Sequence, residues 1–169
     1  LKARLLNDPK ERSENVMIVD LVRNDLSRIA VKNSVKVDEL FGVYTFETVH
    51  HLISTISCKV KADTSFSSIL KATFPMGSMT RETKISAMQL TEKMESFKRG
   101  LYSGSIGYFK PNGDFDFNVV IRSFVQNLKT NRISCAVGSA ITNQAVAESE
   151  YDECMVKVRK MVQLFGDDQ

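Results

Sequence analysis

A chain of 169 residues with 43% hydrophobic content is long enough for one ordinary core and short for two. Its 23 basic and 20 acidic side chains leave a net charge of +3 without a long basic run, which argues against nucleic acid as a partner. No stretch approaches the roughly 20 apolar residues of a membrane span, and the start lacks a signal-peptide pattern. We therefore expect one compact soluble unit whose partners are small molecules or proteins, with no membrane contact.

The cysteines indicate a reducing compartment. Cys58, Cys135 and Cys154 are odd in number and far apart, without the C-x-x-C spacing of a zinc site or the pairing of a disulfide framework. We therefore expect a cytoplasmic protein. The chain also opens on a leucine and runs almost directly into a helix start, as a piece of a longer protein would.

The first expected element is a helix that begins after Asp8 and ends near residue 29. Asp8 is a favourable N-cap, Pro9 suits the first helical position, and Glu11 can complete a capping box. Apolar residues at helical spacing place Glu14 on or beside the buried face, where an uncompensated charge would cost several kcal/mol. We therefore expect a cation opposite Glu14.

The middle of the chain alternates strands and helices. β-branched and aromatic residues predict strands over residues 35–37 and 44–60. A short helix is expected over 65–73, a loop over 74–80 and a second long helix over 82–97.

The C-terminal part predicts three strands and a helix. The strands, over residues 104–109, 115–126 and 132–141, are separated by hairpin turns and should form an antiparallel meander. The last helix is expected over 145–165. The predicted fold class is therefore α+β, an antiparallel sheet with helices packed against it.

Six motifs in a fixed order carry a resemblance to a known family. They are residues 13–15 with 17–26, residues 51–54, residues 75–80 with 84 and 87–88, residues 102–108, residues 121–123, and residues 150–153. The chain resembles the C-terminal part of the chorismate-utilising enzymes, the family of anthranilate synthase component I, aminodeoxychorismate synthase component I, isochorismate synthase and salicylate synthase. The loop over 74–78 and the strand over 113–117 are most similar to the aminodeoxychorismate synthase (para-aminobenzoate synthase) branch.

The resemblance implies that residues 1–169 are the C-terminal portion of a chorismate-binding domain, part of the α/β sandwich of this family. It implies a parent enzyme that converts chorismate and ammonia to 4-amino-4-deoxychorismate for para-aminobenzoate and folate synthesis, with ammonia from glutamine supplied by a glutamine amidotransferase subunit. In this branch a lysine of an upstream Pro-Ile-Lys-Gly-Thr motif adds to the ring, and these residues do not contain that motif. We therefore expect little or no turnover by the isolated chain.

Two other functions stay open. One is another member of the family, such as anthranilate synthase or isochorismate synthase. The other is a non-catalytic binding module of the same fold.

For the metal, the resemblance implies Mg²⁺ held by Glu14 and Glu153, with Glu150 as a nearby or water-mediated contributor. Mg²⁺ takes a few carboxylates together with water and substrate oxygens, so two helices that each present a glutamate suit it. The structural alternative is that Glu14 pairs with a lysine or arginine and that Glu153 bonds Lys157 one turn along the same helix.

For the substrate, the resemblance implies binding by Ser78, Tyr102, Arg122, Gly138, Ser139, Ala140 and Lys157. A guanidinium fork suits a carboxylate, and a tyrosine hydroxyl can donate to one. Without the motif, Arg122 would be a solvated strand-edge residue and Tyr102 a residue at the edge of the core.

The turn at residues 138–140 matches a glycine-rich turn whose backbone N–H groups bind a substrate carboxylate. Ser139 and Ala140 replace residues that are commonly glycine, and each added Cβ narrows the approach of an anion. The alternative interpretation is an ordinary strand end built from small residues.

His51 matches a histidine near the departing ring hydroxyl and is the candidate catalytic acid, base or orienting group, since the unperturbed pKa of histidine is about 6.5. A structural role is the alternative, with His50 facing outward. The family commonly has Gly-Ala-Pro before the lysine at position 84, whereas this chain has residues 81–83 as Arg-Glu-Thr. Lys84 is then a site lysine or a helix-surface cation, and Asp25 belongs to a polar helix end that supports the architecture.

Overall fold

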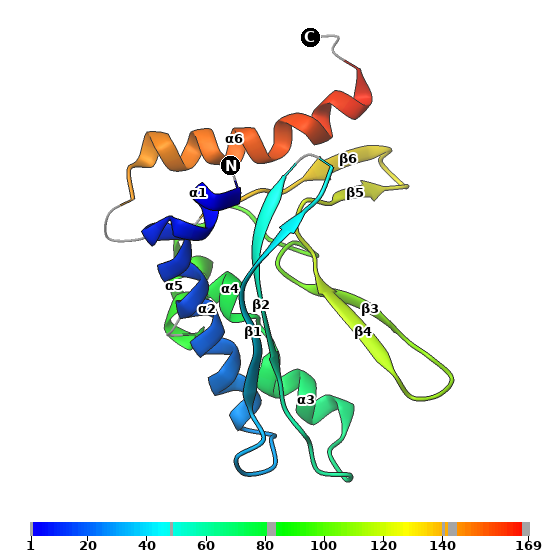
Figure 1. Ribbon diagram of the computed structural model, residues 1–169. Coiled ribbons are helices and arrows are strands. Elements are labelled where there is room, and N and C mark those ends of the chain that lie inside the picture. The colour runs from blue at the N-terminus through cyan, green and yellow to red at the C-terminus, as the bar shows by residue number, and fades with distance from the viewer. Residues whose placement is uncertain (1, 48, 81–83, 140, 142–144, 167–169) are drawn as a thin grey trace. The chain divides into compact units, whose positions relative to one another are not determined.

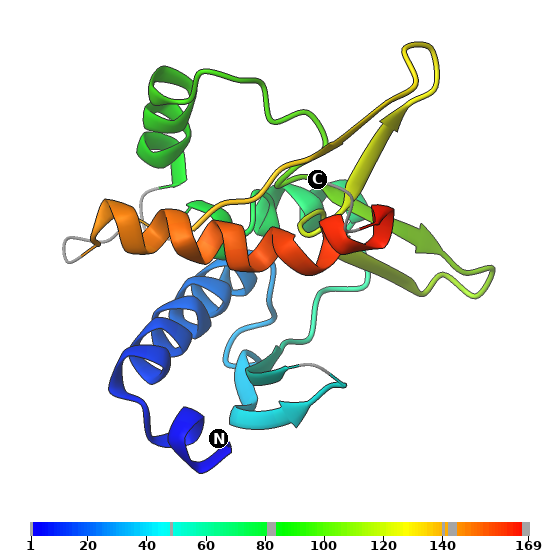
Figure 2. The same cartoon turned by 90° about the horizontal axis from the view of Figure 1, so that it is seen from above.

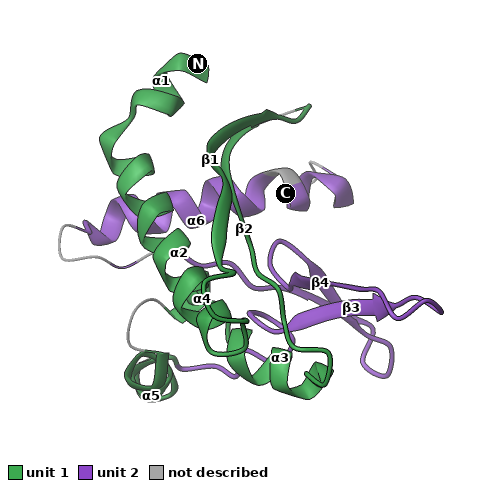
Figure 3. Ribbon diagram, turned by 60° about the horizontal axis from the view of Figure 1, so that its bottom comes forward, with its two compact units in different colours: residues 1–95 green, residues 96–169 purple. Residues whose placement is uncertain are grey.

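The computed structural model describes residues 2–47, 49–80, 84–139, 141 and 145–166. Contacts divide the chain into two compact units, Leu1–Glu95 and Ser96–Gln169 (Figure 3). The expectation that all 169 residues form one compact portion of a larger domain stays a prediction. No helix in the described ranges is long and apolar enough to cross a membrane.

The first unit begins with two helices, the short α1 (Lys2–Asn7) and the long α2 (Pro9–Ser27). The Asp8 carboxylate accepts hydrogen bonds from the backbone N–H groups of Lys10 and Glu11, at 2.9 and 3.2 Å. Because these N–H groups have no partner within the helix, the bonds fix its first turn. The predicted start of α2 is confirmed, and α1, which buries no residue, was not predicted.

A hairpin follows, made of β1 (Lys36–Thr45) and β2 (His50–Ser57), which pair antiparallel from Thr45 opposite His50 to Lys36 opposite Ser57. The prediction of one strand over residues 44–60 is therefore wrong. The Phe46 N–H donates to the Val49 carbonyl at 2.9 Å and closes a turn between the strands. Sequence reasoning missed this turn because it contains neither glycine nor proline and lies among β-branched and aromatic residues.

The rest of the first unit is helical, with α3 (Phe66–Thr73), α4 (Gly77–Thr80) and α5 (Lys84–Met94). The segment over 74–80, predicted as a loop, thus contains a single helical turn, in which the Met79 N–H donates to the Met76 carbonyl at 2.9 Å. The helix predicted over 82–97 is shorter at its C-terminal end, and residues 81–83 lie outside the described residues.

The buried residues of the first unit gather around α2, which contacts β2, α3 and α4 (Figures 1 and 2). Val19 and Leu21 of α2 and Ala72 of α3 are the buried apolar side chains among the described residues, and Asp25 and Thr80 are buried polar ones. One helix therefore organises this unit.

The second unit contains two separate antiparallel hairpins and a long helix. β3 (Ser105–Phe109) pairs with β4 (Phe115–Val119), and β5 (Phe124–Asn127) pairs with β6 (Arg132–Cys135). α6 (Ala147–Val162) follows and ends in a 3₁₀ turn, η1 (Gln163–Phe165), which confirms the predicted last helix.

The α+β class is confirmed, but the predicted meander is wrong in the part of the chain that the structure describes. The strand expected over 115–126 is interrupted at residues 120–123, where the backbone of Arg122 has a φ of 49°. The ladder of β3 and β4 ends at Val119 and that of β5 and β6 begins at Phe124, so residues 120–123 pair with neither partner strand. β4 and β5 therefore belong to different hairpins.

Candidate functional site

Most of the predicted site residues of the second unit lie in one contact chain. The backbone of Gly138 approaches the Tyr102 side chain so closely that a Cβ on this glycine would lie 2.6 Å from the Tyr102 hydroxyl. Lys157 Nζ donates to the Gly138 carbonyl at 3.0 Å and pairs with Glu153 Oε1 at 2.7 Å. A Cβ at this turn would therefore force the Tyr102 side chain to move, a limit set by space rather than by φ.

A second contact joins the same turn to α6. The Ser139 hydroxyl donates to Glu150 Oε2, and both residues are half-buried. Since Glu150 and Glu153 are three residues apart, they lie on neighbouring positions of one helix face. The turn after β6 is therefore held to α6 through both glutamates, directly at Glu150 and through Lys157 at Glu153. Ala140 lies outside the described residues.

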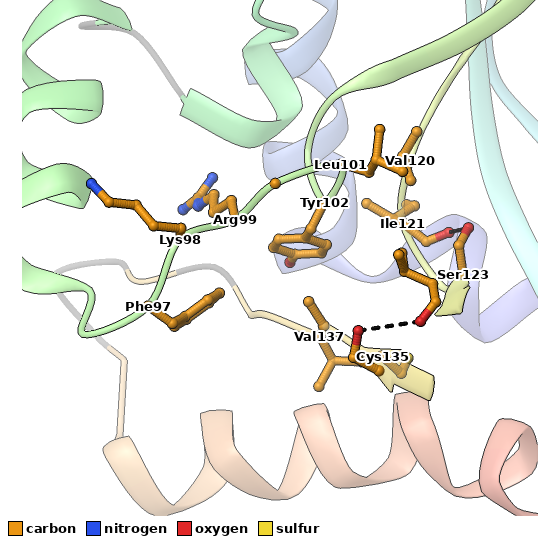
Figure 4. A pocket seen from close by; sticks show the side chains of 14 residues that line it. Phe97, Lys98, Arg99, Leu101, Tyr102, Val120, Ile121, Ser123, Cys135 and Val137 are labelled. Carbon is orange, nitrogen blue, oxygen red and sulfur yellow. Dashed lines mark hydrogen bonds between the residues drawn. The ribbon is translucent and has the colours of Figure 1, made fainter. Parts of the chain in front are cut away.

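Tyr102 also lines a pocket of about 590 Å³ within the second unit. Figure 4 shows the Tyr102 ring in this pocket, with Val137 on the opposite wall. The Arg99 guanidinium lies 5.7 Å from the centre of the Tyr102 ring and donates to the Ser103 hydroxyl at 3.2 Å. Sequence reasoning missed Arg99, although a cation three residues before Tyr102 in a glycine-containing turn was a usable signal.

Cys135 forms another part of the pocket lining. Its partial burial raises the pKa of the thiol, because a thiolate loses hydration there. The Cys135 Sγ also lies 4.0 Å from the sulfur of Met161 on α6. This side of the pocket is apolar.

Arg122 is exposed and outside this contact chain, while its neighbours Ile121 and Ser123 line the pocket. Its φ of 49° and the φ of 66° at Ser103 are both in the left-handed region. The two positions flank the end of the β3–β4 ladder, where the Ser103 N–H donates to the Val120 carbonyl at 2.9 Å. Non-glycine residues in this region are strained, and such strain gathers at functional sites.

In the first unit, Glu14 lies on α2 and is half-buried. Among the described residues no lysine or arginine is within ion-pair distance of its carboxylate. The expected cation opposite Glu14 is therefore not a side chain of the described ranges. By contrast, the alternative proposed for Glu153, a bond to Lys157, is present.

His51 lies on β2 and is half-buried, with its ring edge-on to Phe46 at 5.7 Å between centroids. The residue after Glu14 fixes this strand. Asn15 Nδ2 donates to the Leu52 carbonyl at 3.1 Å, and Asn15 Oδ1 accepts from the Ser54 hydroxyl at 2.6 Å. Asn15 therefore ties β2, at residues 52 and 54, to the helix that carries Glu14.

Ser78 is exposed on α4, and Lys84 begins α5. Lys84 Nζ pairs with Asp25 Oδ2 at 2.5 Å, and the side chains are only 15% and 5% exposed. Lys84 is therefore not a solvated surface cation. It is half of a buried ion pair with α2.

Comparison with known proteins identifies the family. A family model described as chorismate binding enzyme matches residues 1–163. The chain belongs to the chorismate binding enzyme family. Over 159 residues it is 41% identical to aminodeoxychorismate synthase component 1 of Escherichia coli (strain K12), a match that covers 94% of this chain and 35% of that protein. The chain spans about a third or less of the length of the curated relatives it matches.

Solved structures of the family share the fold. The crystal structure of anthranilate synthase component I from Streptococcus pneumoniae TIGR4 matches with a TM-score of 0.81 and 34% identity, over 94% of this chain and 36% of that one. A Bacillus anthracis protein assigned as a 2,3-dihydroxybenzoate-specific isochorismate synthase matches with a TM-score of 0.83 and 25% identity, over 98% and 43% of the two chains. These matches support the α+β class.

The acidic residues at the turn after β6 fit a hard cation by their chemistry. Glu150 and Glu153 present carboxylates one helical turn apart, and Ser139 and Lys157 orient one oxygen of each. Carboxylate oxygens are the side-chain ligands that Mg²⁺ prefers, and it readily keeps several water molecules. No three acidic, histidine or cysteine side chains cluster in the described ranges. A site here would therefore use few protein ligands, completed by water and substrate oxygens.

Proposed function

We propose that this chain is the C-terminal part of an aminodeoxychorismate synthase component I, which converts chorismate and ammonia to 4-amino-4-deoxychorismate. The single observation that carries the proposal is the contact chain from Tyr102 through Gly138 and Lys157 to Glu153. It joins a phenol, a close backbone turn, an ammonium group and a carboxylate. The aminodeoxychorismate synthases among the relatives favour this reaction over others of the family.

Chorismate carries carboxylates, and the second unit supplies donors for them. The Tyr102 hydroxyl can donate one hydrogen bond, and the turn at Gly138 and Ser139 brings backbone N–H groups within reach of an anion. Lys157, oriented by Gly138 and Glu153, adds a positive charge beside the turn. Arg122 supplies a bidentate fork for a second carboxylate. These residues bind and orient the substrate.

Glu14 and Glu153 are the proposed Mg²⁺ ligands, with Glu150 as a nearby contributor. The cation, when bound, neutralises and polarises a carboxylate of chorismate. Glu14 fits this role because it is half-buried and has no ion-pair partner in the described part of the chain. A cation from outside the protein would neutralise this charge.

His51 is proposed to hold or deliver the proton that leaves with the ring hydroxyl. Imidazole side chains are the groups that most often carry out such transfers near neutral pH. The Ser78 hydroxyl is proposed to line the substrate site. Ammonia would come from a glutamine amidotransferase subunit, and the component 1 name of the Escherichia coli relative implies a further component for that protein.

Two other functions remain candidates. The solved relatives include an anthranilate synthase component I and a protein assigned as an isochorismate synthase, so the same scaffold accompanies different products. A non-catalytic binding module of this fold is the third. The glutamate substitutions described in the Discussion bear on that third candidate.

Product analysis of the full-length parent protein tests the proposal. The protein is incubated with chorismate, Mg²⁺ and ammonium, and the products are separated and identified by liquid chromatography with mass spectrometry. We expect 4-amino-4-deoxychorismate. Anthranilate or isochorismate as the sole product would overturn the assignment to this branch, and binding of chorismate without conversion would favour the non-catalytic module. This chain on its own should show little or no turnover.

A further inference from the structure

Two buried residues of α2 hold the segment that contains Ser78. Leu21 and Asp25 are 9% and 3% exposed, and they are four residues apart, which places them on one face of the helix. Gly77 lies against Leu21, and Lys84 pairs with Asp25. Residues 77 and 84 are thus attached to neighbouring turns of the same helix, with Ser78 between them in the sequence.

The first attachment is a close backbone contact. A Cβ at Gly77 would lie 2.8 Å from the Leu21 Cβ and 3.1 Å from its Cδ1. Gly77 is the first residue of α4 and is buried, and Ser78 follows it with an exposed side chain. The backbone that carries Ser78 therefore begins directly on the surface of α2.

The second attachment is the buried ion pair. Lys84 is the first residue of α5, a helix that buries none of its residues. The side chains of Ile85 and Met88 are 75% and 49% exposed, so apolar packing near this end of α5 is weak. Buried ion pairs give little net stability but demand a particular geometry. The pair is thus suited to fix a position.

We propose that the Asp25–Lys84 ion pair is a positioning device that fixes α4, the helical turn containing Ser78, on α2. This inference rests on the proposed function. Glu14 lies seven residues before Leu21, close to the same face of α2. The helix therefore carries a proposed metal ligand and both attachments of a proposed substrate-binding hydroxyl. In this role Asp25 and Lys84 are positioning residues that act through Ser78.

The test removes both charges together. Single removal would leave an unpaired buried charge, whereas the double variant Asp25→Leu with Lys84→Met replaces the pair by apolar side chains of similar size. In the full-length parent protein, we expect kcat/KM for chorismate to fall by about 10- to 100-fold, as for a binding group displaced by about 1 Å. In a Ser78→Ala background the same double substitution should lower kcat/KM by less than about twofold. The ion pair acts by placing the Ser78 hydroxyl, so its loss has little further effect once that hydroxyl is absent.

The control is the exposed Asp20–Arg23 pair on the same helix, at 2.9 Å. Asp20→Asn with Arg23→Gln should leave kcat/KM within about twofold, since exposed pairs contribute little. If the Asp25/Lys84 double substitution costs as much in the Ser78→Ala background as in the wild type, its role is generally structural and the inference is overturned. An unchanged kcat/KM in a folded double variant would do the same.

A second readout separates this inference from the proposed function. Hydrogen exchange of the amides over residues 76–80 should be about tenfold or more faster in the double variant than in the wild type, and unchanged in the Asp20/Arg23 control. If the parent protein does not convert chorismate, the proposed function fails, while unchanged exchange would reject the positioning device itself. Should the double variant not fold, Lys84→Arg is used instead, because it keeps the charge and alters the head group. Its loss of kcat/KM is then compared between the wild type and the Ser78→Ala background.

Discussion

The two units hold their candidate residues in different ways. In the second unit Tyr102, Gly138, Lys157 and Glu153 contact one another in sequence. In the first unit Glu14, His51 and Ser78 are spread over α2, β2 and α4, and each is next to a residue fixed by buried or half-buried contacts. The second unit thus resembles a preformed binding surface, and the first a scaffold that holds separate groups in place.

Among the substitutions that break a contact within one unit, the largest expected effect is that of Lys157. Lys157→Met removes the bond to the Gly138 carbonyl and the ion pair with Glu153 at once. We expect kcat/KM of the parent enzyme for chorismate to fall by about 100-fold, the scale of losing one preorganised electrostatic contact. Arg159→Met, an exposed cation on the same helix, is the matched control and should have little effect. Equal activity of the two variants would show that the Lys157 contacts do not form part of a binding surface for chorismate.

A steric prediction tests the contact between Tyr102 and Gly138. Gly138→Ala should lower the free energy of unfolding by about 1–3 kcal/mol, because its Cβ overlaps the Tyr102 hydroxyl. Adding Tyr102→Phe should recover most of this loss, since the next atom, Tyr102 Cζ, would be 3.7 Å away. Denaturant unfolding of the single and double variants measures this. Additive losses would show that the two residues are apart.

The scaffold role of the first unit depends on Asn15. Asn15→Ala removes both side-chain hydrogen bonds to β2 and should cost about 1–3 kcal/mol, with faster hydrogen exchange over residues 50–57. Asn7→Ala, which removes an exposed 2.9 Å bond to the Ala3 carbonyl, is the control and should change stability little. If β2 exchanges at the wild-type rate in Asn15→Ala, another contact holds the strand.

The smallest effect is on pH dependence. Burial raises the pKa of the Cys135 thiol above its ordinary value of 9.0. A group with a raised pKa in the folded state gives stability that is complete below its unfolded pKa and is lost as pH rises through the folded pKa. Because iodoacetamide reacts with the thiolate, the rate of Cys135 alkylation should reach half of its maximum above pH 9.0. A midpoint below that value would place the thiol in a polar setting.

Local signals made part of this architecture predictable. Asp8 and Pro9 specify the start of α2 through a cap and a preset φ, and Ser65, the N-cap of α3, accepts from the Ser68 N–H at 3.2 Å. By contrast, the turn at residues 46–49 lacks glycine and proline. The left-handed backbone of Arg122, in the segment between β4 and β5, has no local cause in the sequence either.

The candidate site depends on contacts between distant residues, which periodicity cannot supply. Glu153 and Lys157 are four residues apart, so their bond was among the alternatives drawn from the sequence. Asp25 and Lys84 are 59 residues apart, and Tyr102 meets Gly138 from a different segment. Motifs suggested which residues matter, while their pairing became visible only in the fold.

The proposed metal site is tested by the Mg²⁺ dependence of chorismate conversion by the parent enzyme and by its Glu14→Gln and Glu153→Gln variants. We expect each substitution to lower kcat/KM by about 100-fold or more and to raise the Mg²⁺ concentration needed for half-maximal rate. Glu148→Gln, an exposed glutamate on α6, should behave as the wild type. Wild-type Mg²⁺ dependence in either the Glu14 or the Glu153 variant would contradict the two-glutamate site.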